Sequence, residues 1–152
     1  RAPTIPKAVK SFLSDTSSFS PEWSGSILRM LPESVRGAYP LLREHLRILS
    51  AGICIGEAKG KDFIPAEELA LSTALRPDAF PVADLDWDDA IRYLKKEALL
   101  LPAGTEKGYV LVRHKKFPLG FAKHLGNRAN NLYPQEWRIR TGYVPEQVKT
   151  FE

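Results

Sequence analysis

The sequence predicts an α+β fold: a small, strongly bent sheet or partial β-barrel with two short helices, preceded by a short helical connector. Short apolar runs divided by turn residues recur from Leu46 onward and indicate strands. Two segments in the same stretch show helical spacing of apolar residues behind a helix-start signal. Up to residue 40, five prolines and a serine cluster favour short pieces over a long element. With 152 residues, 43% of them hydrophobic, the chain can bury a core of this kind.

The same signals divide the chain into three regions. Residues 1–45 are expected to form a connector or the tail of an upstream domain, residues 46–140 the bent-sheet domain, and residues 141–152 a C-terminal tail. The chain begins at Arg1 rather than Met, so we expect a fragment or a processed product of a longer protein.

Each element has a local signal. In the connector, Ser20 stands at an N-cap position and Pro21 at the first helical position, which predicts a short helix through Leu31. The elements of the domain are expected in this order: strands at 46–50 and 53–58, a helix of about three turns beginning at Pro65, a helix that Asp86 caps, a short strand at 99–101, and paired strands at 109–113 and 119–123 joined by a turn at 114–118.

Charge is distributed unevenly along the chain. Residues 113–140 hold seven Lys and Arg against one Glu, a net charge of +6, whereas the whole chain carries +4. Residues 62–106 hold ten acidic and four basic residues, a net charge of −6. A basic face with an acidic back is typical of a protein that orients on a polyanion. The alternative is that the acidic residues simply solvate two helices.

The segment from Gly120 to Arg140 combines cations, amides and aromatic rings, and it predicts a surface for nucleic acid. Lys and Arg neutralise phosphates, Asn and Arg make forked hydrogen bonds to bases, and exposed rings stack on bases. We expect the best contacts at Lys123, Asn127, Arg128, Asn130, Asn131 and Arg138, with Lys59, Lys61, Lys115 and Lys116 as second-rank phosphate contacts. The alternative role for each Asn is to form a turn, and for Phe117, Tyr133 and Trp137 it is a place in the core.

The sequence offers little support for catalysis, metal binding or membrane insertion. The single cysteine, Cys54, lies between isoleucines, so a packed thiol in a reducing compartment such as the cytoplasm is expected rather than a nucleophile. The three histidines lack the spacing of metal ligands, and no phosphate-binding loop of the long glycine-rich type is present. No run of about 18 apolar residues predicts a membrane span.

An ordered set of sequence blocks resembles a known family. The blocks are LSAGICIGEAKGKDFIP, FPVADLD, AIRYLKKEAL, KGYVLV and, most specifically, PLGFAKHLGNRANNLYPQEWRIR. From Leu46 to Arg140 the chain resembles the small PUA-like, RNA-binding domain at the C-terminus of the Nol/Nop/Sun-type RNA cytosine-5 methyltransferases, particularly the bacterial F-type enzymes that act on ribosomal RNA. The resemblance covers about 95 residues, and residues 1–45 match it only loosely.

This resemblance implies a role within a larger enzyme. The chain would bind ribosomal RNA and position it for an upstream catalytic domain in cis, which uses S-adenosylmethionine. The catalytic cysteines of that family stand in Pro-Cys-Ser and Thr-Cys contexts, and neither context occurs in this chain. The fragment itself is therefore expected to bind no cofactor and to catalyse no methyl transfer. The alternative is a structural or protein-interaction module that packs on the catalytic domain or on a ribosomal protein.

Overall fold

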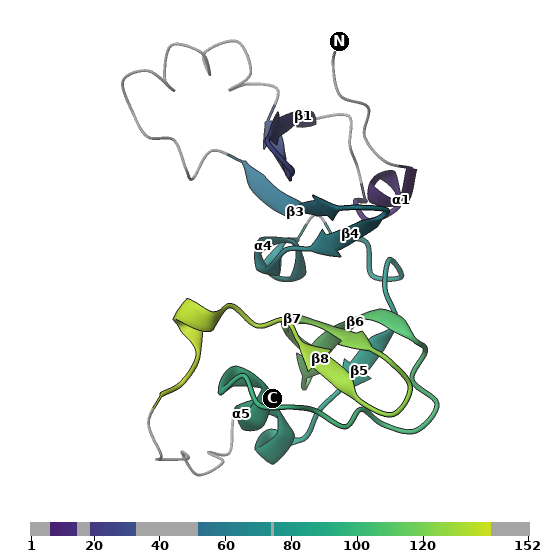
Figure 1. The fold of residues 1–152 in the computed structure, drawn as a ribbon, viewed down its shortest axis with the longest axis vertical. Helices are drawn as coiled ribbons and strands as arrows, with labels where there is room; N and C mark the ends of the chain where they lie inside the picture. The colour runs from purple at the N-terminus through teal and green to yellow at the C-terminus, as the bar shows by residue number, and fades with distance from the viewer. Residues whose placement is uncertain (1–6, 15–18, 33–51, 74, 141–152) are drawn as a thin grey trace. The chain divides into compact units, whose positions relative to one another are not determined.

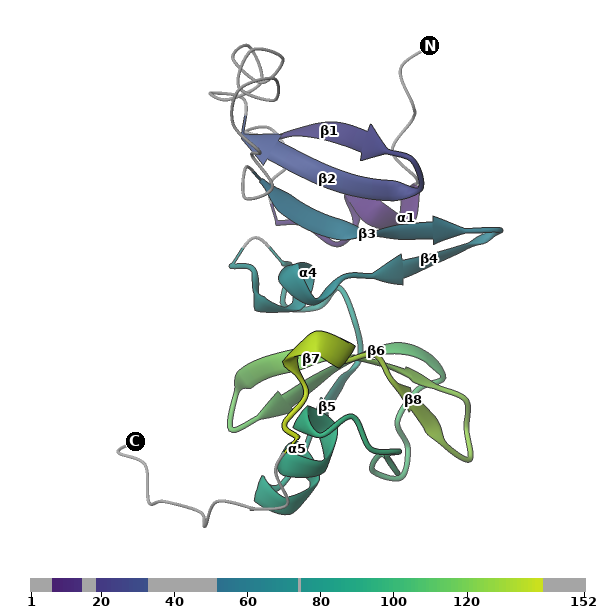
Figure 2. The ribbon, with the colours of Figure 1, turned by 60° about the vertical axis from the view of Figure 1, so that its left-hand side comes forward.

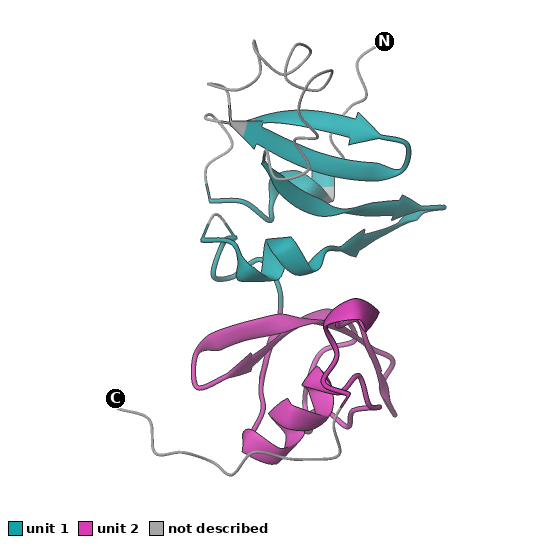
Figure 3. Cartoon of the chain, turned by 90° about the vertical axis from the view of Figure 1, so that its left-hand side faces the viewer, with its two compact units in different colours: residues 1–80 teal, residues 81–152 magenta. Residues whose placement is uncertain are grey.

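The computed structural model describes residues 7–14, 19–32, 52–73 and 75–140. It divides into two compact units, residues 1–80 and 81–152 (Figure 3). Each unit holds one open four-stranded sheet and short helices, which confirms the predicted α+β class. The expected domain boundary at 45/46, the strand at 46–50 and the tail at 141–152 lie outside the described residues.

Unit 1 is an antiparallel sheet whose strands lie side by side in chain order, β1-β2-β3-β4 (Figure 2). Its elements are α1 (Lys7–Lys10), β1 (Phe19–Ser24), β2 (Ile27–Pro32), β3 (Ile53–Lys59), β4 (Asp62–Pro65) and α4 (Glu67–Leu71). Residues 53–65 thus share a sheet with residues 19–32 rather than with the elements that follow residue 80.

The helix predicted from Ser20 to Leu31 is wrong, because this segment forms the hairpin β1–β2. Gly25, at a φ of +60°, begins the two-residue turn between the strands, a conformation that glycine adopts without strain. Pro21 lies in β1, at the edge of the sheet, where a missing N–H is tolerated. The Ser20-Pro21 pair is therefore compatible with the start of a helix and with an edge strand. The pairing of β1 with β2 decides between the two.

Two further expectations in unit 1 change in detail. The strand expected at 53–58 is confirmed as β3, and it pairs with β4 through the turn at Gly60. The helix expected to begin at Pro65 is shorter than three turns, because Pro65 ends β4 and the backbone becomes extended at Ser72. Leu75 instead forms an isolated bridge with Leu13.

Unit 2 combines one parallel and two antiparallel strand pairs in the order β5-β6-β7-β8 (Figure 1). Its elements are β5 (Val82–Asp84), α5 (Trp87–Leu94), β6 (Gly108–His114), β7 (Phe117–His124), β8 (Ala129–Asn131) and the 3₁₀ helix η1 (Gln135–Trp137). The paired strands β6 and β7 confirm the prediction, but their turn is Lys115–Lys116 rather than 114–118. The short strand expected at 99–101 is reduced to a single bridge between Leu99 and Ala129.

Helix α5 packs against the sheet of unit 2 and supplies its core. Asp86 caps the helix as predicted, because its Oδ1 accepts a hydrogen bond from the backbone N–H of Asp89 at 2.8 Å. Tyr93 is fully buried and donates its hydroxyl to the carbonyl of Phe121 at 2.8 Å. The surrounding core consists of Leu85, Ala90, Leu99, Val112, Ala122 and Ala129. Among the residues that the structure describes, no helix is long and apolar enough to cross a membrane.

Glu67, in the first turn of α4, predicts a pH-dependent stability for unit 1. Both oxygens of its carboxyl are buried and lack a hydrogen-bond partner within the described ranges, and burial raises its pKa from 4.5 to about 8. Between those values the folded chain holds a proton that the unfolded chain releases, so stability falls as the pH rises from about 5 to 8. We expect Glu67→Gln to stabilise unit 1 by about 1–3 kcal/mol at pH 8 and much less at pH 5.

Urea unfolding at both pH values checks this expectation. The same change at Glu106, whose side chain is exposed in unit 2, serves as the control. Equal effects of Glu67→Gln at pH 5 and pH 8 would contradict the assignment of a buried, neutral Glu67.

Candidate nucleic-acid interface

A row of side chains crosses the strands β6, β7 and β8. Tyr109 pairs with Lys123, and Lys123 pairs with Asn130, so the three side chains lie on one face of the sheet. The ammonium of Lys123 lies 5.2 Å from the centroid of the Tyr109 ring, a cation–π distance. The neighbours of Lys123 in its strand, Ala122 and His124, are buried. The row therefore faces away from that part of the core, and Asn130 in it is exposed.

The loop between β7 and β8 extends this row. It is closed by a hydrogen bond of 2.8 Å from the backbone N–H of Leu125 to the carbonyl of Arg128, and it exposes Asn127 and Arg128. Gly126, at a φ of +103°, has no Cβ, and one built there would lie 2.9 Å from Cε of Lys107. Lys107 is thus a further exposed cation beside the loop, and the positive φ of Gly126 is one that glycine adopts without strain.

Asn131 differs from its neighbour, because the fold already uses its amide. Its Nδ2 donates to the carbonyls of Tyr93 and Glu97 at 2.9 and 3.0 Å, and its Oδ1 accepts from the N–H of Tyr133 at 2.9 Å. Lys96 adds hydrogen bonds from its ammonium to the carbonyls of Asn131 and Tyr133. Asn131 therefore fastens the end of β8 to the end of α5, and it is left out of the proposed contact surface.

Arg138 follows η1 and is exposed. The backbone N–H of Ile139 donates to the carbonyl of Leu94 at 2.9 Å, which fixes this segment to the end of α5. Trp137 is 52% exposed and meets the ring of Tyr133 at 6.3 Å in an edge-on arrangement. Its ring is thus not part of the core, and a face of it is accessible for stacking.

The second-rank cations occupy separate places. Lys115 and Lys116 form the turn between β6 and β7, at the end of β7 away from Arg128, and both are exposed. Lys59 and Lys61 belong to the β3–β4 hairpin of unit 1 and are exposed as well. The first-rank cations all belong to unit 2, where Lys123 and Arg128 stand on one hairpin.

Cys54 and His124 could in principle react, but Cys54 is half-buried and His124 is buried. Burial, the largest cause, raises the pKa of the Cys54 thiol, so the thiolate is disfavoured. His124 is buried, and its Nδ1 lies 3.1 Å from the carbonyl of Glu106. Across the described part of the chain, no group of three or more His, Cys, Asp and Glu residues is arranged to hold a metal ion.

Residues 80–139 match the family model described as the methyltransferase RsmF PUA domain. The chain is also 32% identical over 110 residues to the ribosomal RNA small subunit methyltransferase F of Shewanella baltica (strain OS195), covering 69% of this chain and 22% of that protein. The enzyme of the same name from Shewanella pealeana is 32% identical over 92 residues, covering 60% of this chain and 18% of that protein. These matches confirm the resemblance that the sequence blocks indicated.

The matches cover a small part of the relatives and a defined part of this chain. The chain spans about a fifth of the length of the curated relatives it matches. The family match begins at residue 80, where the two units divide, and ends at residue 139, so apart from residue 80 it lies within unit 2. All first-rank contact candidates lie within residues 80–139.

Proposed function

Because residues 80–139 match the PUA domain of the RsmF type, we propose that this chain is the RNA-binding accessory part of a ribosomal RNA (cytosine-5) methyltransferase. It positions RNA for a catalytic domain upstream in the longer protein, and that domain binds S-adenosylmethionine and transfers the methyl group. Such an enzyme works in the cytoplasm, where ribosomal RNA is accessible to it.

The row of Tyr109, Lys123 and Asn130 with the adjoining loop is the structural observation that supports RNA binding in this proposal. Lys123 and Arg128 present two cations for neighbouring phosphates on one hairpin. Asn127 and Asn130 supply exposed amides that can donate to and accept from base edges or a 2′-hydroxyl. These cations and amides fit contacts to the backbone and to some bases of an RNA better than contacts to an apolar protein surface.

The role of the remaining candidates follows from their places. Arg138 adds a third cation beside Trp137, whose exposed ring can stack on an unpaired base. Lys59 and Lys61 are proposed to contact phosphates from unit 1. Holding RNA in this way helps offset the cost of a few kcal/mol for taking the target base out of a stack.

A salt series tests the proposal. We expect the chain to bind a structured ribosomal RNA hairpin with an affinity that falls steeply with salt, because each neutralised phosphate contributes a slope of about −0.7 to −0.9. The three first-rank cations alone predict a slope of about −2 to −3 on the log–log plot, and contacts by Lys59 and Lys61 make it steeper. A matched DNA duplex provides the comparison for 2′-hydroxyl contacts. Binding that ignores salt would overturn the proposal in favour of a protein-interaction module.

A further inference from the structure

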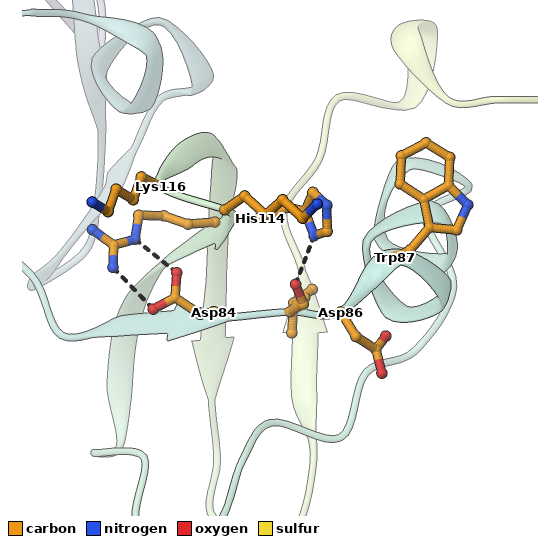
Figure 4. A pocket seen from close by; sticks show the side chains of 8 residues that line it. Asp84, Asp86, Trp87, His114 and Lys116 are labelled. Carbon is orange, nitrogen blue, oxygen red and sulfur yellow. Dashed lines mark hydrogen bonds and ion pairs between the residues drawn. The ribbon is translucent and has the colours of Figure 1, made fainter. Parts of the chain in front are cut away.

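An open pocket of about 500 Å³ lies in unit 2, away from the row and loop described above. It forms where β5 leads into α5 and where β6 turns into β7 (Figure 4). β7 separates the β6–β7 turn from the β7–β8 loop by its full length, roughly 25 Å for a strand of this size. The pocket is therefore a second site, distinct from the residues that carry the proposed function.

An ion pair lines one wall of the pocket. The guanidinium of Arg113 donates from Nε and from its terminal nitrogen to the two carboxylate oxygens of Asp84, at 3.0 and 2.9 Å. The hydrogen bond that Arg113 donates to Asp84 raises the pKa of Arg113. Because the two charges neutralise each other in a fixed, forked geometry, this pair shapes the wall without adding net charge.

Two aromatic rings continue the wall. Nδ1 of His114 lies 2.8 Å from the carbonyl of Leu85, which fixes the imidazole. The Trp87 ring meets that imidazole edge-on, with 5.8 Å between ring centroids. Figure 4 shows the indole standing at the start of α5, on the far side of His114 from the Asp84 pair. The indole is partly exposed and lines the pocket.

Two lysines complete the pocket from the turn. Lys115 and Lys116 adopt φ angles of +47° and +70°, a left-handed conformation that costs non-glycine residues about 1–2 kcal/mol each. Within the described ranges, neither ammonium forms an ion pair with a carboxylate. Asp86 is the one acid in the lining without a paired cation, so the lining carries a net charge of +1. An anionic ligand is favoured.

We propose that this pocket receives a single unpaired nucleotide of RNA. The base lies against the ring of Trp87, and its phosphate lies at Lys115 and Lys116. Asp86 also lines the pocket, and its Oδ1 caps α5. This inference rests on the proposed function, to which it adds a preference for RNA with an unstacked nucleotide.

Two RNA hairpins that differ by one bulged nucleotide test this inference with the whole chain. The unaltered chain is expected to bind the bulged hairpin more tightly. Trp87→Leu should lose about 5- to 100-fold of its affinity for the bulged hairpin, whereas Trp87→Phe, which keeps a ring, should retain most of it. Affinity for the hairpin without a bulge should be unchanged in both variants.

A second variant does not depend on the packing of Trp87. Lys115→Gly with Lys116→Gly removes both charges, and glycine adopts the left-handed turn without strain, so the fold is retained. We expect weaker binding of the bulged hairpin and a salt slope that is shallower by about 1 to 2. The matched control is Lys7→Ala with Lys10→Ala, which removes two exposed lysines from α1.

The outcomes separate the two proposals. Equal, salt-sensitive binding of both hairpins by the unaltered chain overturns the pocket and leaves the proposed function standing. The pocket is likewise overturned if folded Trp87→Leu and the double glycine variant both keep the preference for the bulge. Absence of binding to either hairpin overturns both proposals.

Discussion

Reversing three charges together, in Lys123→Glu with Arg128→Glu and Arg138→Glu, should lower the affinity for RNA by more than about 100-fold at 0.1 M salt. Each substitution removes a cation that can neutralise a phosphate and places a carboxylate in the same region. The net charge changes by six units, from +4 to −2. Fluorescence anisotropy with a labelled RNA hairpin measures the loss, and it should shrink as salt is raised because the contacts are electrostatic.

A control separates local contacts from overall charge. Lys7→Glu with Lys10→Glu reverses two exposed lysines in α1, outside every proposed contact. We expect this variant to lose less than about threefold in affinity, since steering by net charge acts over longer distances and is screened by salt. If the triple variant is folded and binds RNA within threefold of the unaltered chain, the proposed contact surface is wrong.

Replacing Asn131 by alanine should destabilise unit 2 by about 2–4 kcal/mol. The amide of Asn131 makes three hydrogen bonds. Its Nδ2 donates to the carbonyl of Tyr93 in α5 and to that of Glu97 in the turn after α5, and its Oδ1 accepts from the N–H of Tyr133. Alanine leaves these backbone groups without their partner, and partly buried groups of this kind are costly to leave unpaired. Thermal and urea unfolding, followed by the near-ultraviolet signal of the aromatic side chains, report the change.

The neighbouring residue provides the matched control. Asn130→Ala changes the same side chain one position earlier in β8, but Asn130 is exposed. We expect its effect on stability to stay within about 0.5 kcal/mol, while RNA affinity falls by a few-fold. Equal losses of stability in the two variants would show that Asn131 does not fasten β8 to α5.

Local signals predicted much of unit 2 correctly. The N-cap at Asp86 could be read from the sequence because a cap is satisfied within three residues. Strands β6 and β7 were predictable because a short turn joins two short apolar runs. The parallel pair of β5 and β6 was not predictable, because it joins residues separated by a helix and a long connection.

The candidate site, too, could be predicted from the sequence only in part. Composition alone located the cluster of cations and amides between Lys123 and Arg138. It could not separate Asn130 from Asn131, because they are chemically identical and only the alternation of a strand sends one outward and the other to α5. Lys107 was missed because its approach to Gly126 joins two loops far apart in the sequence.

The hydrogen bonds of Asn131 also set the order in which unit 2 can form during synthesis. The amide of Asn131 and its acceptor, the carbonyl of Tyr93, are 38 residues apart. Helix α5 therefore leaves the ribosome before Asn131, whose side chain donates to a carbonyl in its last turn. A helix of eight residues is too short to persist by itself in water. We therefore expect unit 2 to fold in one late step, after β8 has been made, and at the slower rate typical of chains rich in long-range contacts.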